Sequence, residues 1–186
     1  IPFHAGDAKY RDNNGDGRID DKDRVKLGSS IPWLNYGLTI GAEWKGIDLS
    51  IFFQGVGGNK IYNQMRHRLE GNGSTSVLSP VMTDAWTAEN PDGYIPNPKN
   101  TINYYVSDRF LESGSYFRLK NLQIGYTLPQ KWMSAIGFQK CRFYFQGGNL
   151  FTVTKYKGYD PETLGGVDYG NYPQARSFIF GVNITY

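Results

Sequence analysis

The sequence has few of the residues that build metal centres and disulfide scaffolds. It contains one cysteine, two histidines and three methionines in 186 residues. A lone cysteine excludes a disulfide framework or a thiolate zinc site within this chain, and Cys141 alternates with Phe143 as an ordinary strand residue does. No run of residues approaches the roughly 18 apolar positions that a transmembrane helix needs. Disulfide-rich domains and helical membrane proteins are therefore excluded.

The sequence also lacks a large net charge. Twenty basic and 17 acidic residues give a net charge of +3, and no cluster of Lys and Arg stands out. We therefore expect no nucleic-acid partner. His4 and His67 have no partner at a catalytic spacing, and acidic residues such as Asp160 and Glu162 are scattered. The sequence accordingly predicts no enzyme.

Aromatic residues and glycine are abundant instead. The chain has 14 Tyr, 11 Phe, 4 Trp and 23 Gly, which favours β-structure with many turns. The last ten residues alternate almost strictly, with one exception at Ile179. The apolar set is Phe178, Phe180, Val182, Ile184 and Tyr186; the other face carries Ser177, Gly181, Asn183 and Thr185. This pattern is typical of a membrane β-barrel wall, with apolar side chains facing lipid.

The same alternation predicts five strands. They are Pro32 to Trp44, Ile47 to Val56, Tyr116 to Leu128, Lys140 to Thr154, and Ser177 to Tyr186. Two connections are short: Lys45-Gly46 and the segment Gln130 to Gln139. Three are long: residues 1–31, 57–112 and 155–176. The second of these carries turn signals at 71–76 and 90–93 and a predicted short helix at 80–87.

This alternation of long and short connections predicts an all-β, antiparallel, up-and-down transmembrane barrel. Such barrels have short periplasmic turns and long extracellular loops. Five strands cannot close a barrel, since the smallest have about eight. We therefore interpret residues 1–186 as the carboxyl-terminal part of a larger barrel, with 1–31 an extracellular loop and 32–186 strands and loops. The start at Ile1, without Met or a signal peptide, suggests a mature or truncated product.

One segment has metal-ligand spacing. Residues 12–23 match the twelve-residue calcium loop, in which oxygens at positions 1, 3, 5, 7, 9 and 12 surround the ion and Gly at position 6 permits a sharp turn. The predicted Ca²⁺ ligands are Asp12, Asn14, Asp16, the Arg18 carbonyl, Asp20 and Asp23. We expect their oxygens to converge even without the ion. Because Asp23 is shorter than the usual Glu, we expect a dissociation constant of about 10⁻⁵ to 10⁻³ M. The alternative is an Asx-rich turn without an ion.

Aromatic residues in the loops are candidate ligand contacts. Trp44 and Trp132 fall at the predicted periplasmic ends of strands, where an interfacial girdle explains them. The candidates for contact with cargo are Trp86, Tyr94, Tyr104 and Tyr105, all in the second long connection.

Several segments resemble one family, the barrel of SusC/RagA-type TonB-dependent transporters. These segments are residues 13–21, 48–55, 117–126, 148–152, 155–162 and 172–173. The resemblance implies the last five strands of a barrel of about 22 strands in the bacterial outer membrane. It further implies a plug in the lumen, a SusD-like surface lipoprotein, energy from the TonB complex, and oligosaccharide or peptide cargo. The plug and the TonB box are not in this sequence.

A second hypothesis comes from a different class of protein. A secreted calcium-binding β-sandwich that binds carbohydrate would also alternate and carry exposed aromatics. A sandwich predicts solubility without detergent and aromatic residues on one face of a sheet, whereas a barrel predicts a lipid-facing band flanked by aromatic girdles.

Overall fold

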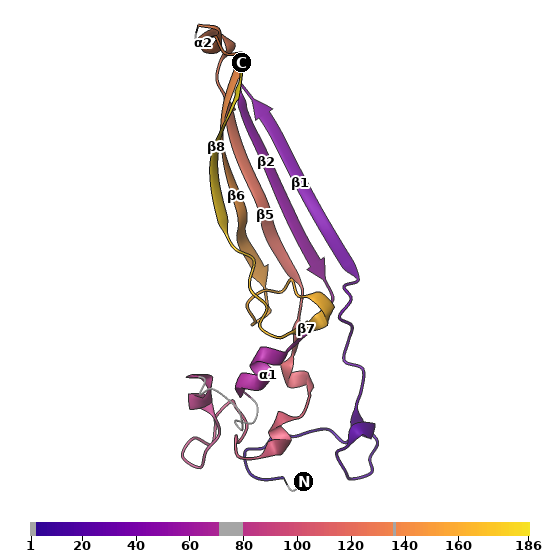
Figure 1. Cartoon of the computed structure of the whole chain (residues 1–186). Helices are drawn as coiled ribbons and strands as arrows, with labels where there is room; N and C mark the ends of the chain where they lie inside the picture. Colours follow the sequence, from indigo (N-terminus) through magenta and orange to yellow (C-terminus); the bar gives the residue numbers. More distant parts are fainter. Residues whose placement is uncertain (1–2, 71–79, 136) are drawn as a thin grey trace.

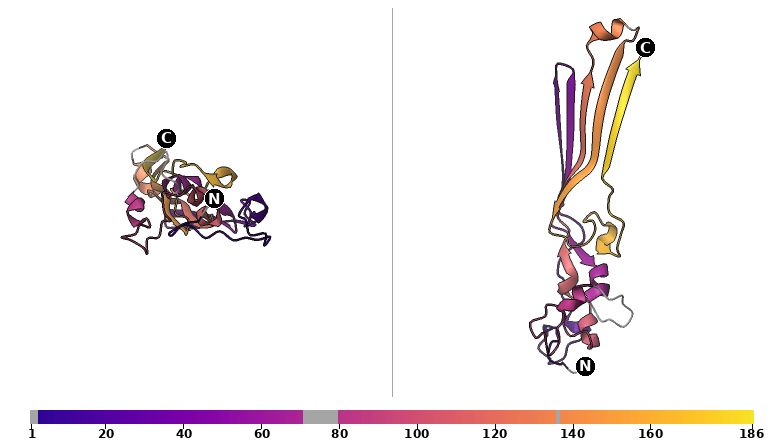
Figure 2. Two further views of the ribbon diagram at one scale, coloured as in Figure 1. Left: turned by 90° about the horizontal axis from the view of Figure 1, so that it is seen from below. Right: turned by 90° about the vertical axis from the view of Figure 1, so that its left-hand side faces the viewer.

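A computed structural model describes residues 3–70, 80–135 and 137–186. The molecule is elongated and has two parts (Figure 1). One part is a long five-stranded sheet, called the large sheet here. The other, called the loop lobe, comprises the described residues of 3–33, 58–115 and 155–176, and it gathers at one end of the large sheet (Figures 1 and 2).

The strands form two separate sheets. The large sheet has the order β1 (Leu34–Trp44), β2 (Ile47–Gly57), β5 (Tyr116–Thr127), β6 (Lys140–Thr154) and β8 (Ser177–Thr185), with every pair antiparallel. The small sheet has the order β4 (Leu111–Ser113), β3 (Lys60–Asn63) and β7 (Val167–Asp168). In it β3 pairs antiparallel with β4 and parallel with β7.

The helices are all short. The α-helices are α1 (Gln64–Glu70) and α2 (Gln130–Ser134). The 3₁₀-helices are η1 (Asp21–Asp23), η3 (Pro80–Asp84), η4 (Thr101–Tyr104), η5 (Asp108–Phe110) and η6 (Leu164–Gly166). No helix among the described residues is long and apolar enough to cross a membrane.

The predicted fold class is confirmed as an open, antiparallel, incomplete barrel wall. All five predicted strands form, with ends shifted by at most two residues. The large sheet has the five strands predicted for the barrel wall, and β3, β4 and β7 form a further small sheet that the sequence did not predict. These three strands have only two to four residues, too few for alternation to be recognised. The predicted helix at 80–87 is a 3₁₀-helix that ends at Asp84, and the turn signal at 71–76 lies outside the described residues.

Strand register places the alternating residues on two common faces. Leu49 pairs with Ile124, Ile124 with Phe145, and Phe145 with Phe180. Directly opposed residues of neighbouring strands project from the same face, so this row forms one apolar face. The row through Ser50, Gln123 and Gln146 belongs to the opposite, polar face. The predicted division of side chains between the two faces is confirmed.

The connections also separate as predicted. The Lys45-Gly46 turn and α2 lie at the end of the sheet far from the loop lobe (Figure 1). The Gly46 carbonyl accepts a hydrogen bond from the Thr127 amide at 2.7 Å, which brings the two turns together. Lys45 and Gly46 both have positive φ (48° and 85°), as a two-residue hairpin turn requires.

Burial differs sharply between the two parts. The fully buried large side chains Phe110, Ile61, Ile95 and Ile102 all lie in the loop lobe. Apolar side chains of the large sheet remain exposed, including Phe180 at 80% and Leu38 at 54%. Among the described residues no second sheet covers this apolar face (Figure 2). The structure therefore does not support the β-sandwich hypothesis.

Candidate functional site

A buried arginine ties the loop lobe to the polar face of the large sheet. Arg118 in β5 is only 2% exposed, and its Nη2 donates to Asp160 Oδ1 at 2.6 Å. Its Nη1 donates to Glu162 Oε2 at 2.8 Å, and its Nε to Thr152 Oγ1 at 2.8 Å. The guanidinium carbon lies 5.2 Å from the centre of the Tyr116 ring. We call Arg118, Thr152, Asp160 and Glu162 the Arg118 network. Loss of the Arg118 charge would leave Asp160 buried without its charged partner.

Asp160 is the centre of this network on the loop side. Its carboxylate also accepts hydrogen bonds from the backbone amides of Glu162 and Gln174, both at 2.9 Å. Burial raises the pKa of the Asp160 carboxyl, but these amides and the Arg118 guanidinium more than offset it. The pKa therefore lies below its ordinary value, and the ionised carboxylate holds both ends of the loop turn.

A polar cavity of about 380 Å³ lies beside the Arg118 network. Its wall includes residues of β5 and β6 and residues of the 155–176 loop. Those that matter below are Arg118, Asn149, Tyr159, Asp160, Gln174 and Arg176.

A second ion pair crosses the polar face nearer the turns. Arg142 of β6 donates through Nε to Asp48 Oδ1 of β2 at 2.8 Å, and through Nη2 to Oδ2. The pair passes over β5 at Gly125, where an added Cβ would lie 2.4 Å from Arg142 Nη2. Glycine at this position is thus what allows a two-pronged ion pair to span three strands.

The loop lobe has its own buried charge cluster. Arg66 of α1 donates to Glu70 Oε1 at 2.6 Å and to Glu112 Oε1 at 3.1 Å. Arg109 donates to Glu70 Oε2 at 3.1 Å. Desolvation lowers the pKa of Arg66, but the bonds to Glu70 and Glu112 more than offset it and hold the guanidinium ionised. These pairs join α1, η5 and β4 into one unit.

A buried histidine completes the packing of the lobe. His67 is 4% exposed, its Nε2 lies 2.8 Å from the Tyr104 carbonyl, and its Nδ1 lies 3.0 Å from the Tyr62 hydroxyl. Its ring stacks on Tyr104 at 4.3 Å and tilts against Phe110 at 4.7 Å. Burial raises the pKa of Tyr62 to about 12. His67 is thus enclosed by aromatic rings and bonded to a carbonyl and a hydroxyl, as expected of a histidine with a structural role.

The predicted calcium loop adopts a compact turn. The Asp12 carboxylate accepts from the amides of Gly15 at 2.6 Å and Gly17 at 2.8 Å, and Asp16 Oδ1 accepts from the Arg18 amide at 2.9 Å. Asp23 is 9% exposed, and it accepts from the amides of Asn13 and Asp20.

The predicted calcium ligands stay a prediction. Among the described residues no three His, Cys, Asp or Glu side chains are grouped as metal ligands. In this structure the carboxylates of Asp12, Asp16 and Asp23 accept hydrogen bonds from backbone amides of their own loop. Asn14 Oδ1 and Asp20 Oδ1 likewise accept from the amides of Asp16 and Lys22.

The predicted cargo contacts are spread over the loop lobe. Tyr94, Tyr104 and Tyr105 are 61%, 39% and 41% exposed. Each also contacts a neighbouring side chain. The Tyr94 hydroxyl accepts a hydrogen bond from Arg66 Nη2, and the Tyr104 ring stacks on His67. The ring centres of Tyr105 and Tyr10 lie 6.0 Å apart. Trp86 is half-buried over Gly6. None of the four lines the polar cavity beside the Arg118 network.

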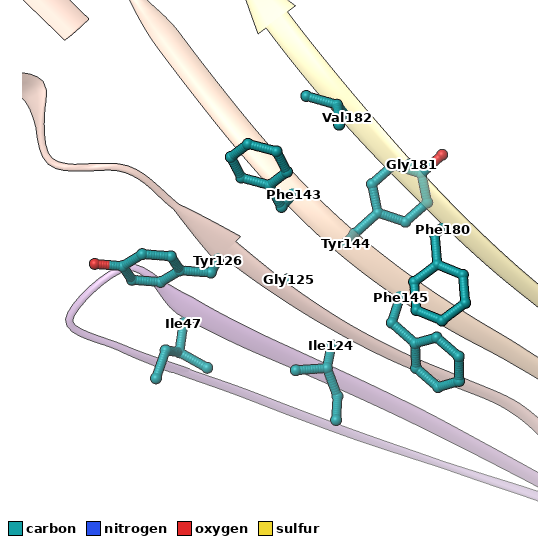
Figure 3. Close-up of a pocket in the computed structure, with 10 residues that line it drawn as sticks. All are labelled: Ile47, Ile124, Gly125, Tyr126, Phe143, Tyr144, Phe145, Phe180, Gly181 and Val182. Atoms are coloured by element: carbon teal, nitrogen blue, oxygen red, sulfur yellow. The ribbon is translucent and has the colours of Figure 1, made fainter. Parts of the chain in front are cut away.

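The apolar face carries a shallow depression of about 730 Å³ near its turn end (Figure 3). Figure 3 shows Ile124, Phe145 and Phe180 from three neighbouring strands around it. Phe145 and Phe180 have ring centres 5.0 Å apart. The depression is bounded almost entirely by apolar side chains, so its natural occupant is an apolar solvent.

Known proteins with this sequence pattern are TonB-dependent receptors. The chain is 33% identical to TonB-dependent receptor P3 of Formosa agariphila over 97% of its own length, and 28% identical to TonB-dependent receptor SusC of Bacteroides thetaiotaomicron over 95%. The solved structure of the RagAB peptide transporter superposes on 91% of the chain with a TM-score of 0.80 at 29% identity. The chain matches a barrel segment of SusC/RagA-type TonB-dependent receptors. It spans 19%, 17% and 19% of these three proteins, respectively, and no family model matches it.

The segments that resemble these receptors occupy defined places in the structure. Residues 48–55 lie in β2 and residues 117–126 in β5. The segment 155–162 supplies Asp160 and Glu162 to the Arg118 network. Sequence reasoning treated both acids as scattered and did not notice Arg118. The available signal was an arginine beside Phe117 within a strand, where a charge needs a partner.

Proposed function

We propose that this chain forms part of the wall of a TonB-dependent importer in the bacterial outer membrane. The observation that carries this proposal is the exposed apolar face, opposite a face that bears buried ion pairs. In water such a face would be costly, whereas lipid accommodates it. In this arrangement the apolar face contacts outer-membrane lipid, and the Arg118 network and the Asp48–Arg142 pair face the lumen.

Tryptophans at the two ends of the large sheet support the placement. Trp33 stands at the lobe end of β1 and is 78% exposed. Trp44 and Trp132 stand at the turn end and are 67% and 61% exposed. Such aromatic belts mark the two interfaces of a membrane. Because outer-membrane barrels have short periplasmic turns and long extracellular loops, we assign the turns to the periplasmic side and the loop lobe to the outside of the cell.

The activity belongs to the full-length receptor. We propose that the missing part supplies the rest of the barrel, the plug and the contact with TonB. A SusD-like lipoprotein covers the loop lobe, and oligosaccharides or peptides are imported. The names of the relatives, SusC and the RagAB peptide transporter, support this set of partners. Trp86, Tyr94, Tyr104 and Tyr105 are the proposed aromatic contacts for cargo, and no catalytic step is expected.

We also propose that residues 12–23 bind Ca²⁺ weakly. The ligand spacing and the positive φ of Gly15 (78°) and Gly17 (76°) support this. Binding would require Asp16 and Asp23 to exchange amide hydrogen bonds for the ion, which favours low affinity. On an extracellular loop the ion would stiffen the turn.

Site-directed labelling tests the placement directly. In full-length receptor with Cys141→Ser as background, Tyr172→Cys and Trp132→Cys place one thiol at each end of the large sheet. We expect a membrane-impermeant maleimide to label Tyr172→Cys in intact cells and Trp132→Cys only after permeabilisation. Labelling of Trp132→Cys in intact cells would reject the orientation. Loss of TonB should abolish uptake of labelled cargo without changing the labelling.

A further inference from the structure

The polar cavity beside the Arg118 network has an excess of positive charge. Arg118 is matched by Asp160, and Lys120 lies 3.1 Å from Glu162, which also receives Arg118. Arg176, on the wall of the cavity, has no hydrogen bond or ion pair within the described part of the chain. Counting these five side chains, three are cationic and two are anionic, so one positive charge is left over.

In the part of the chain that the structure describes, the acids of the Arg118 network form no bond to Arg176. Asp160 Oδ1 already accepts from Arg118 and from the Glu162 amide, and Oδ2 accepts from the Gln174 amide. Glu162 Oε2 receives both Arg118 and Lys120. None of these bonds goes to Arg176, so its guanidinium remains available.

A bulge in β6 holds the segment that carries Arg176. Asn149 has a φ of 51°, and its Nδ2 donates to the Ala175 carbonyl at 3.0 Å. This bond fixes the residue next to Arg176 against the strand. Tyr159, at 68% exposure, stands at the rim.

We propose that this cavity is a subsite for a carboxylate group of the imported solute, with Arg176 as the group that binds it. Guanidinium binds a carboxylate through two parallel hydrogen bonds, and a volume of about 380 Å³ admits a single residue or sugar ring. The carboxylate belongs either to the end of a peptide or to a uronic sugar. This inference rests on the proposed function, because it places the cavity in the lumen of the importer.

Binding to the full-length receptor in detergent tests the proposal. The probes are triglycine and its carboxyl-terminal amide, and digalacturonic acid and neutral digalactose. Calorimetry should show that the unmodified receptor binds one of the two acids more tightly than its neutral counterpart. The pair of probes that shows this preference identifies the source of the carboxylate. We expect Arg176→Gln to weaken binding of that acid about tenfold or more, since loss of even one of the two charged hydrogen bonds has an effect of this size. Binding of the neutral counterpart should be unchanged.

Two variants separate a binding role from a structural one. Lys155→Gln removes the same charge from the same loop but does not line the cavity, so it should leave the preference intact. Asn149→Gly keeps positive φ accessible while deleting the amide, and it should lower affinity for the acid less than Arg176→Gln does. No preference for either acid in the unmodified receptor, or equal losses in Arg176→Gln and Lys155→Gln, would overturn the proposal. The maleimide labelling above is independent of this result, so failure of the subsite and failure of the membrane placement are distinguishable.

Discussion

The loop lobe and the large sheet use apolar residues in opposite ways. In the lobe, Phe110 and Ile61 are fully buried, and ions such as Arg66 are paired beneath the surface. In the sheet, Phe180 and Leu38 face outward, and the paired ions lie on the other side. One region suits water, and under the proposed function the other suits lipid. The same chain can contain both regions. In the sheet, strand alternation separates apolar and polar side chains onto two faces, whereas in the lobe the apolar side chains are buried together in a core.

The largest expected effect lies in the lobe. Phe110→Ala should destabilise it by about 3–5 kcal/mol, since a fully buried ring is lost and a cavity is left. Hydrogen exchange in the full-length receptor should show lost protection at the amides around Ile61 and Ile102, with the large sheet unchanged. Tyr172→Ala, at a position 94% exposed, should change stability by less than about 0.5 kcal/mol. Equal loss of protection in β5 and β6 would mean that the two regions do not fold separately.

The second effect is specific to lipid. Phe180→Arg should cost about 2–4 kcal/mol if the side chain lies near the middle of the bilayer. Asn183→Arg, on the polar face, should cost far less. Denaturant titration of the full-length receptor refolded into lipid vesicles measures both. Equal destabilisation by the two substitutions would contradict the assignment of the faces.

The third effect concerns the junction between the two regions. Asp160→Asn should weaken attachment of the 155–176 loop by about 1–3 kcal/mol, because charged hydrogen bonds become neutral ones. Glu162 still pairs with Arg118, which limits the loss. Limited proteolysis of this loop in the full-length receptor is the readout, with the exposed Lys157→Gln as the control. Unchanged proteolysis of Asp160→Asn would show that the network does not hold the loop.

The lowered pKa of Asp160 predicts that attachment of the 155–176 loop depends on pH. The pKa of Asp160 is lowered in the folded state, so its contribution to stability is complete above the unfolded value of about 3.9. This contribution to stability is lost as the pH falls through the lower pKa that Asp160 has in the folded state. Proteolysis of the loop by an acid-active protease should therefore increase below about pH 4, and Asp160→Asn should abolish that increase.

Most of the large sheet could be predicted from its sequence because each strand is long enough to show alternation. The face on which Arg118 lies could be assigned only from the structure. Simple alternation from Leu122 would put Arg118 on the apolar face, but a bulge between Leu119 and Asn121 reverses the phase. Leu119 and Leu122 therefore share the apolar face, and Arg118 faces the acids of a loop about 40 residues away. The spacing of three between these leucines was the visible sign.

Less of the candidate site could be predicted. The acids that pair with Arg118 and Arg66 come from loops whose contacts depend on tertiary packing, not on spacing. For example, Asp160 reaches Arg118 only because Gln174 and Glu162 fold a turn around its carboxylate. The small sheet was missed for a similar reason: β7 has two residues and pairs with β3 from a distant part of the chain.

The smallest expected effect is calcium binding by the lobe, and it would sharpen the contrast because the large sheet has no comparable motif. With a dissociation constant near 10⁻⁴ M, 1 mM Ca²⁺ would stabilise the loop by about 1.4 kcal/mol. Asp16→Ala removes a central ligand and should abolish uptake in a calorimetric titration of the full-length receptor. Asp21→Ala removes an equally acidic side chain that is 86% exposed and lies outside the ligand positions, so it should bind calcium as before. Calcium uptake that is identical in the unmodified receptor and Asp16→Ala would reject the site. In that case the Asp12 carboxylate, bonded to the amides of Gly15 and Gly17, serves only to shape the turn.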